Sequence, residues 1–124
     1  MNVEGVTTLT SPYSASETAD RLVNFLQAKG MKIFARIDQA AEAQAVGLIL
    51  RPTILILFGN PTAGTPLMEH FPSLAVDLPL KALVWECTGK VYLSHVSPEY
   101  LQKRHDLPIT PFAQMPDLMA AALR

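Results

Sequence analysis

The residues best suited to bind a ligand follow an apolar run near the middle of the chain. Gly59 and Gly64 are separated by four residues, and Thr65 follows directly. This spacing resembles that of a phosphate-binding loop, whose backbone N–H groups hold anions. The lysine expected after the second glycine is missing, and two nearby prolines remove N–H groups. We predict an anion or carboxylate site here, with Asn60 and Thr65 as contacts. The alternative is a tight strand-to-helix connection.

A second candidate ligand site lies on a predicted β-hairpin over residues 80–96, with a tight turn over 87–90. A two-residue turn places Trp85 opposite Tyr92, on the face that also carries Lys81. Aromatic side chains beside an amine are typical of the lining of a ligand cleft. Alternatively, the aromatic pair only stabilises the sheet.

Histidine, cysteine and acidic residues form no recognisable catalytic or metal-binding motif. His70, His95 and His105 fall on three different predicted elements, with no two at metal-ligand spacing. They would form a site only if the fold brought them together with a carboxylate such as Glu86 or Asp77. Cys87 has no neighbouring base that would activate it as a nucleophile. The sequence therefore predicts no metal and no cofactor, and it assigns no catalytic residue.

Hydrophobic periodicity, caps and turns predict the elements that position these side chains. A helix follows Ser14, whose hydroxyl forms a capping box with Glu17, and it ends before Gly30. A continuous apolar run over 53–58 predicts a strand that is central in its sheet or covered by a second subunit. The other elements are strands at 3–10 and 31–37, short helices at 39–46 and from Thr65 to about Pro72, the hairpin, and helices at 98–105 and 117–123.

This order of elements, βαβ(α)β(α)ββαα, predicts an α+β fold in one domain over residues 1–124. We expect a single, mainly antiparallel sheet with helices packed on one face. A doubly wound parallel sheet would require regular alternation of strand and helix, which the hairpin interrupts. In the strand over 31–37 apolar residues alternate with polar ones, so we expect one buried face that includes Ile33 and Ala35.

Charge and hydropathy exclude some partners. The 10 Lys and Arg residues are scattered among 11 Asp and Glu residues, and the net charge is −1. Neither nucleic acid nor an anionic membrane surface is expected, because both require a basic patch. No apolar run approaches the roughly 20 residues that span a bilayer, and the first residues do not resemble a signal peptide.

The apolar content points to assembly. Hydrophobic residues make up 49% of the chain, which is high for a small domain with much surface. A subunit interface would cover this excess, so we predict a homodimer. The single cysteine excludes an intrachain disulfide and suits a reducing cytoplasm.

Four segments, at residues 9–14, 29–38, 58–68 and 77–86, together resemble the family catalogued as "domain of unknown function 302". The similarity runs in order across most of the chain and thins after about Leu107. The resemblance implies a compact α+β fold with an antiparallel sheet, often found as a dimer. It implies no activity and no catalytic residues.

The function favoured by the sequence is a cytoplasmic homodimeric module that binds a small anion or carboxylate. One alternative is a small enzyme that uses Glu86, Lys81 or a histidine as its acid–base group. Another is a structural or partner-binding protein that assembles through the 53–58 strand or the last helix. The candidate ligand-binding residues are Gly59, Asn60, Gly64, Thr65, Lys81, Trp85 and Tyr92.

Overall fold

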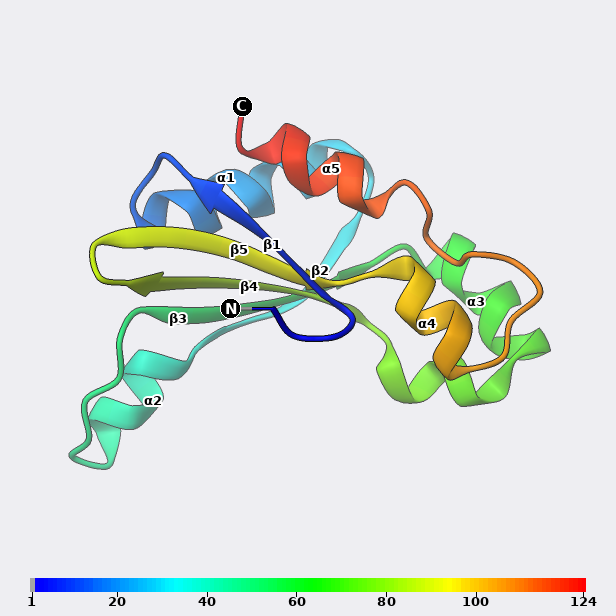
Figure 1. Ribbon diagram of the computed structural model, residues 1–124, viewed down its shortest axis with the longest axis horizontal. Helices are drawn as coiled ribbons and strands as arrows, with labels where there is room; N and C mark the ends of the chain where they lie inside the picture. Colours follow the sequence, from blue (N-terminus) through cyan, green and yellow to red (C-terminus); the bar gives the residue numbers. More distant parts are fainter. Residues whose placement is uncertain (1) are drawn as a thin grey trace.

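Five strands form one antiparallel sheet in the computed structural model, which describes residues 2–124 (Figure 1). The order across the sheet is β1-β5-β4-β3-β2, and all neighbouring strands run antiparallel. The predicted single antiparallel sheet is therefore confirmed. The strands are β1 (Val6–Ser11), β2 (Lys32–Asp38), β3 (Thr53–Gly59), β4 (Leu80–Cys87) and β5 (Lys90–Val96).

Two of the helices cover one face of this sheet. In Figure 1, α1 and α5 lie on the same side of the strands, α2 projects on the other side, and α3 and α4 lie at one end. Within residues 2–124 no helix combines the length and the apolar character needed to cross a bilayer. The helices are α1 (Ala15–Ala28), α2 (Gln39–Ala45), α3 (Pro61–His70), the 3₁₀ helix η1 (Pro72–Asp77), α4 (Pro98–Arg104) and α5 (Met115–Ala122).

Helix α1 begins at the Ser14 cap that the sequence predicts, although the Glu17 carboxylate lies by Arg21 instead of completing the capping box, and the helix supplies much of the core. The Ser14 hydroxyl accepts a hydrogen bond from the Glu17 N–H at 3.1 Å. The amphipathic face of α1 buries Leu22 and Leu26 completely, in one cluster with Phe58 of β3. Burial of each such side chain contributes about 1.5–3 kcal/mol. The contact between α1 and the sheet is therefore a main source of stability.

Strand β3 is apolar on both faces, but helices cover only one of them. It lies between β2 and β4, so the predicted interior position is confirmed. Ile54, Ile56 and Phe58 point towards the helices and are at most 7% exposed. Leu55 and Leu57 point to the other face and are only half-buried. The pattern of a fully buried strand thus arises here from one covered and one partly exposed face.

We call the second face of the sheet the open face. Its members are paired across strands, as Leu55 with Leu83 and Trp85 with Tyr92, and the latter pair is the one that the sequence predicts. All of these side chains are half-buried. The apolar part of the open face comprises Leu55, Leu57, Leu83, Trp85 and Tyr92, and Lys81 and Ser94 lie on the same face, opposite Leu57 and Leu83.

The predicted alternation in β2 is present, with Ile33 and Ala35 half-buried and Phe34 exposed, but the half-buried residues do not share one face of the sheet. A β-bulge between Ile33 and Ala35 shifts the register. Ile33 consequently pairs with Phe58 on the helix-covered side, whereas Ala35 pairs with Leu57 on the open face. The same shift directs Arg36 towards α1, where its guanidinium lies 2.6 Å from the Asp20 carboxylate.

The predicted loop over residues 59–64, with Thr65 as the helix cap, is also wrong. Helix α3 begins at Pro61, and the Asn60 side chain caps it by accepting hydrogen bonds from the N–H groups of Thr62 and Ala63. Asn and the following Pro are a better start signal than Thr-Pro five residues later, because Pro61 takes the first helical position. Pro66 lies inside the helix.

The other differences concern boundaries. Strand β1 begins at Val6 rather than Val3, and α5 begins at Met115 rather than Asp117. The 3₁₀ helix η1 was not predicted, because Pro72 at its start is the predicted end of the preceding helix.

A histidine is buried within the helix-covered side of the sheet. His95 of β5 lies opposite Ala82, as the hairpin register predicts, and is 3% exposed. One ring nitrogen, Nδ1, lies 3.2 Å from the Val96 carbonyl oxygen, and Nε2 has no hydrogen-bond partner among residues 2–124. Burial lowers the pKa of His95 below its usual 6.5. The folded chain therefore holds this ring in its neutral form.

This buried ring predicts a loss of stability in acid. Below about pH 6.5 the unfolded chain binds a proton at His95 that the folded chain does not, so stability is lost as the pH falls. We expect the His95→Leu variant to gain stability over the natural chain, by about 1 kcal/mol or more at low pH and less at pH 8. Urea unfolding at pH 5 and pH 8 measures the difference. An equal effect at both pH values would contradict the assignment.

Candidate functional site

A hollow of about 280 Å³ lies where the end of the sheet meets α4, and we call it the Lys81 cleft. Lys81 comes from the start of β4, Asp77 from the end of η1, and Tyr100 and Arg104 from α4. Apolar side chains complete the lining: Leu80, Val96, Leu101 and Met115. Polar groups over an apolar base are typical of sites for small molecules.

Lys81 retains an unneutralised positive charge in this cleft. Its ammonium donates to the carbonyl oxygens of Asp77 at 3.3 Å and Pro79 at 3.1 Å. Neither acceptor carries a charge, and an ammonium group has three protons to donate. One N–H therefore remains for a ligand, on a side chain that is half-buried and held in place by two backbone contacts.

Arg104 adds a second cation, which is paired with a carboxylate. Its Nε lies 2.8 Å from Asp77 Oδ2, and this hydrogen bond raises the pKa of the guanidinium further. Two cations and one carboxylate line the cleft, so its net charge is positive. A positive concave site attracts small anions.

Asp77 also joins a chain of hydrogen bonds that extends away from the cleft. Its Oδ2 lies 2.5 Å from His105 Nε2, and His105 Nδ1 lies 2.9 Å from the Ser73 hydroxyl. Burial raises the pKa of Asp77, but the hydrogen bonds from His105 and Arg104 outweigh it, and the net pKa is lowered. Asp77 therefore stays ionised at neutral pH.

Sequence reasoning missed this cluster, although it named Asp77 as a partner that the fold might bring to a histidine. Ser73 and Asp77 both come from η1, and His105, which directly follows α4, bonds to each of them. The cluster was not predicted because η1, the element that carries Ser73 and Asp77, was itself not predicted. Among residues 2–124 no group of three or more His, Cys, Asp or Glu side chains is placed to hold a metal ion.

Tyr100 is held in the cleft by the N-terminal segment. Gly5 has a φ of +78°, and a Cβ placed there would lie 2.4 Å from the Tyr100 ring. Only glycine allows both this backbone conformation and this approach.

This contact predicts that Gly5→Ala disturbs the cleft. We expect Gly5→Ala to lower the free energy of unfolding by about 1–3 kcal/mol more than Gly89→Ala does. Gly89 is the matched control because its φ is +77° but a Cβ there would have nothing within 4 Å. Both variants carry the same backbone strain, so chemical denaturation isolates the clash with Tyr100. Equal losses would show that the ring moves freely.

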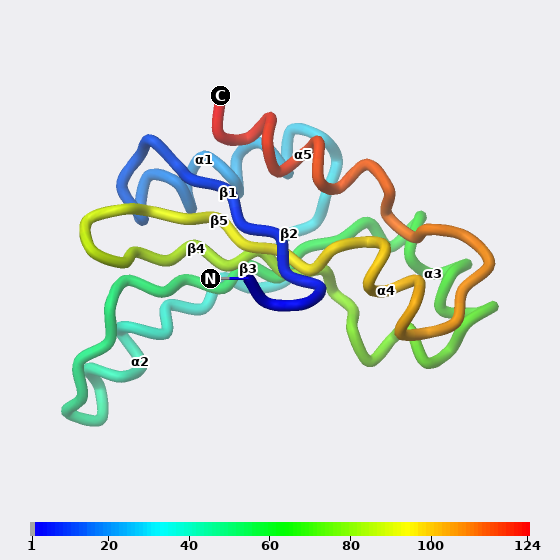
Figure 2. Tube along the Cα trace, viewed as in Figure 1, coloured from blue at the N-terminus to red at the C-terminus, as the bar shows by residue number. Residues whose placement is uncertain are grey.

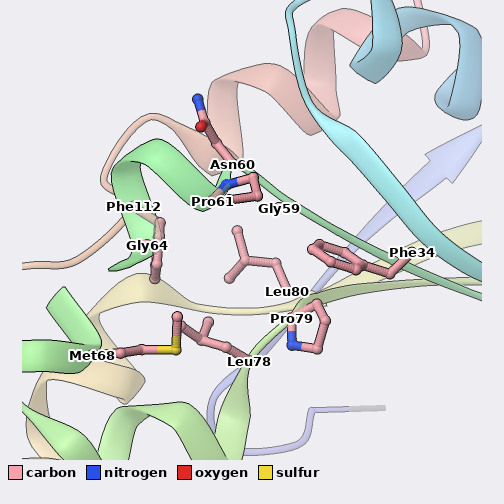
Figure 3. A pocket seen from close by; sticks show the side chains of 10 residues that line it. All are labelled: Phe34, Gly59, Asn60, Pro61, Gly64, Met68, Leu78, Pro79, Leu80 and Phe112. Carbon is pink, nitrogen blue, oxygen red and sulfur yellow. The ribbon is translucent and has the colours of Figure 1, made fainter. Parts of the chain in front are cut away.

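A second hollow, of about 220 Å³, holds three of the residues that we predicted as ligand contacts: Gly59, Asn60 and Gly64. Its other lining residues are apolar, and they include Phe34, Met68, Leu78 and Phe112 (Figure 3). Phe112 comes from the segment between α4 and α5, which runs past α3 in Figure 2. This hollow suits an apolar group.

The start of α3 offers little to an anion. The Asn60 side chain already accepts from two of the first N–H groups of the helix, at 3.0 Å and 3.4 Å. Pro61 has no N–H, and the Gly64 N–H bonds to the Asn60 carbonyl at 2.8 Å. In Figure 3 the Asn60 amide points away from Leu80 and Leu78. Thr65 is exposed and outside both hollows.

The aromatic pair of the hairpin forms as predicted but lies outside both hollows. The rings of Trp85 and Tyr92 are 4.8 Å apart, and Trp85 Nε1 donates to the Ser94 hydroxyl at 2.9 Å. Ser94 in turn bonds to Thr8 of β1 at 2.8 Å. This network links three strands on the open face, so it supports the structural alternative for these residues. Of the predicted contacts, Lys81 alone lines the charged cleft.

The fold and the sequence together define the family. The chain belongs to the family described as "Domain of unknown function DUF302", whose model matches residues 7–123. A crystal structure of a conserved DUF302 protein from Bacillus stearothermophilus superposes with a TM-score of 0.84 at 20% identity, covering 98% of this chain and 97% of that one. The family and the α+β fold that the sequence predicts are thus both confirmed.

Curated relatives include much longer proteins. The chain is 43% identical over 104 residues to "Fluoride-specific ion channel FluC 1" of Brucella suis, covering 83% of this chain and 41% of that protein. The match to "Fluoride-specific ion channel FluC 2" of Brucella melitensis has the same identity and covers 38% of that protein. The chain spans about two fifths of these relatives, whose name describes the whole protein.

Proposed function

We propose that this chain is a homodimeric small-molecule-binding module that holds a small carboxylate or phosphate in the Lys81 cleft. The observation that carries the proposal is the Lys81 ammonium, which is half-buried, bonded only to uncharged carbonyl oxygens, and open to a further acceptor. Arg104 and Tyr100 on the same rim supply further donors. The proposed ligand site is therefore here, rather than at the start of α3.

A cytoplasmic location is part of the proposal. The single cysteine, Cys87, is half-buried and unpaired, which suits a reducing compartment. Small carboxylates and phosphates are abundant solutes of such a compartment, so a positive cleft of this size would meet its ligand there.

Thermal melting in succinate and in inorganic phosphate tests the site. We expect a concentration-dependent rise in Tm for at least one of these anions, equivalent to about 2.7 kcal/mol when the concentration is 100 times Kd. The Lys81→Met variant should lose this rise, because the free ammonium donor is gone. The outcome distinguishes the two kinds of anion by which of them stabilises the natural chain.

Lys90→Met is the matched control. Lys90 is exposed at the tip of the hairpin. Its replacement by Met removes the same charge outside the cleft, so the response of this variant to both anions should equal that of the natural chain. A rise that persists in Lys81→Met, or that disappears in Thr65→Val, would contradict the proposed site. No response to either anion would favour a protein that works by assembly alone.

The proposal of a dimer is based on apolar surface that is exposed to solvent in the monomer. An apolar arm of residues 46–50 follows α2, and within it Val46 is 72% exposed, Leu48 65% and Ile49 101%. The arm carries no charge. It projects on the side of the sheet opposite α1 and α5, which is the side of the open face (Figure 1). Exposed apolar surfaces of this kind are typical of protein–protein interfaces.

A second copy of the chain is the partner that fits this surface. Each copy has one arm and one open face on the same side of its sheet. In a two-fold dimer the arm of each copy packs on the open face of the other, so both apolar surfaces are covered by the same symmetric contact. A bilayer is a poorer occupant, because the chain has a net charge of −1 and no cluster of basic residues beside the arm.

Light scattering coupled to size-exclusion chromatography tests the dimer. We expect the natural chain to have the mass of a dimer at micromolar concentration, and Ile49→Glu to have that of a monomer, because a carboxylate cannot be buried against the open face without a partner. Ile109→Glu is the control, since Ile109 is also exposed, at 53%, but lies on the segment after α4. A monomeric natural chain, or a dimeric Ile49→Glu variant, would overturn this part of the proposal.

A further inference from the structure

We propose that Ser73 is an activated nucleophile that accepts an acyl group from a carboxylic ester, with His105 as its general base and Asp77 as the residue that positions His105. The three side chains form an unbroken chain of hydrogen bonds, with 2.9 Å between Ser73 and His105 and 2.5 Å between His105 and Asp77. A nucleophile in contact with a base that a third group orients is the arrangement that activates serine.

The bonding around His105 fixes the tautomer that a base needs. Asp77 Oδ2 is a carboxylate oxygen and only accepts, so in the neutral ring Nε2 carries the proton and donates it. The lone pair of Nδ1 is then free to accept the Ser73 O–H. The ring cannot rotate away, because its side chain is 4% exposed and bonded at both nitrogens.

The two residues at the ends of this series of hydrogen bonds, Ser73 and Asp77, differ in exposure as the chemistry requires. Ser73 lies at the surface of η1, where a substrate reaches it without rearrangement of the fold. Asp77 is partly buried and bonded to Arg104 as well, which keeps the carboxylate in place. An ionised Asp77 stabilises the imidazolium that forms when His105 takes a proton.

The reaction balances with these groups and water. Ser73 Oγ attacks the ester carbonyl carbon while its proton passes to His105 Nδ1. The bond to the alcohol then breaks, and the alcohol leaves with the proton from Nδ1. Water, deprotonated by the same nitrogen, releases the acid and restores the serine. No oxidant, metal or further reactant is needed.

This inference goes beyond the binding of an anion and does not depend on it. The Lys81 cleft borders Asp77, but neither Ser73 nor His105 lines it. Lys81→Met therefore tests the binding site, and variants of Ser73 test the nucleophile. A negative result for anion binding would not contradict the proposed nucleophile, and a negative result for the nucleophile would not contradict anion binding.

Hydrolysis of p-nitrophenyl acetate by the full chain tests the nucleophile. We expect release of p-nitrophenolate and an acetyl group on Ser73 in the mass spectrum of the intact protein and its peptides. Ser73→Ala should abolish both, and His105→Gln should slow acylation about 100-fold. Asp77→Asn should lower kcat with little change in KM, which a purely structural role would not produce. Ser16→Ala is the matched control, because Ser16 is exposed on α1, and it should have no effect.

The melting temperature of each variant shows whether it is folded. Ser73→Ala is the decisive variant, because the loss of an exposed hydroxyl should leave the fold unchanged while it removes the nucleophile. Acetylation of Ser73 that is lost in His105→Gln supports the proposal. Release by the natural chain that does not exceed release by Ser73→Ala, or an acetyl group found elsewhere, would overturn it. In that case the hydrogen bonds serve only to join η1 to α4.

Discussion

The structure depends on the burial of one face of a sheet whose strand β3 is apolar on both. Ile54, Ile56 and Phe58 are covered by helices, and the fully buried Leu22 and Leu26 of α1 complete that core. Helices α1 and α5 lie on the same face of the sheet, so Leu55 and Leu57 on the other face remain half-buried. Hydrophobic burial therefore stabilises the fold and at the same time leaves the open face that we propose a second copy covers.

The other helices lie where the sheet ends, and their chemistry follows from that position. Helices η1 and α4 meet beside the start of β4, and Asp77 is the residue at which their contacts converge. One carboxylate oxygen serves Arg104 on the side of the cleft and His105 on the side of Ser73. In the two sites that we propose, the same carboxylate would therefore position Arg104 for a ligand and His105 as a base for Ser73.

How much the sequence predicts depends on how local each signal is. The cap at Ser14 and the pairing of Trp85 with Tyr92 were both predicted, because each depends on a few neighbouring residues. The bulge in β2 was missed, because alternation of residue types does not record the partner strand. The start of α3 was misplaced because two Pro-containing start signals compete, and Asn60 makes the better cap.

The side chains of the two proposed sites differ in the same way. Lys81 was a candidate because it shares a predicted hairpin face with aromatic residues, although the cleft that it lines is formed with α4. Ser73 and Asp77 lie on η1, about 30 residues before His105, and the contacts of both with His105 depend on tertiary packing. No spacing in the sequence encodes it.

The most direct test of the binding site is a titration of ¹⁵N-labelled protein with succinate and with phosphate, followed by the amide chemical shifts. We expect the largest changes at Lys81, Tyr100 and Arg104, with saturation at a common Kd. Changes concentrated over Asn60–Thr65 would instead place the anion at the start of α3. The absence of saturable changes at either place would contradict anion binding by this domain.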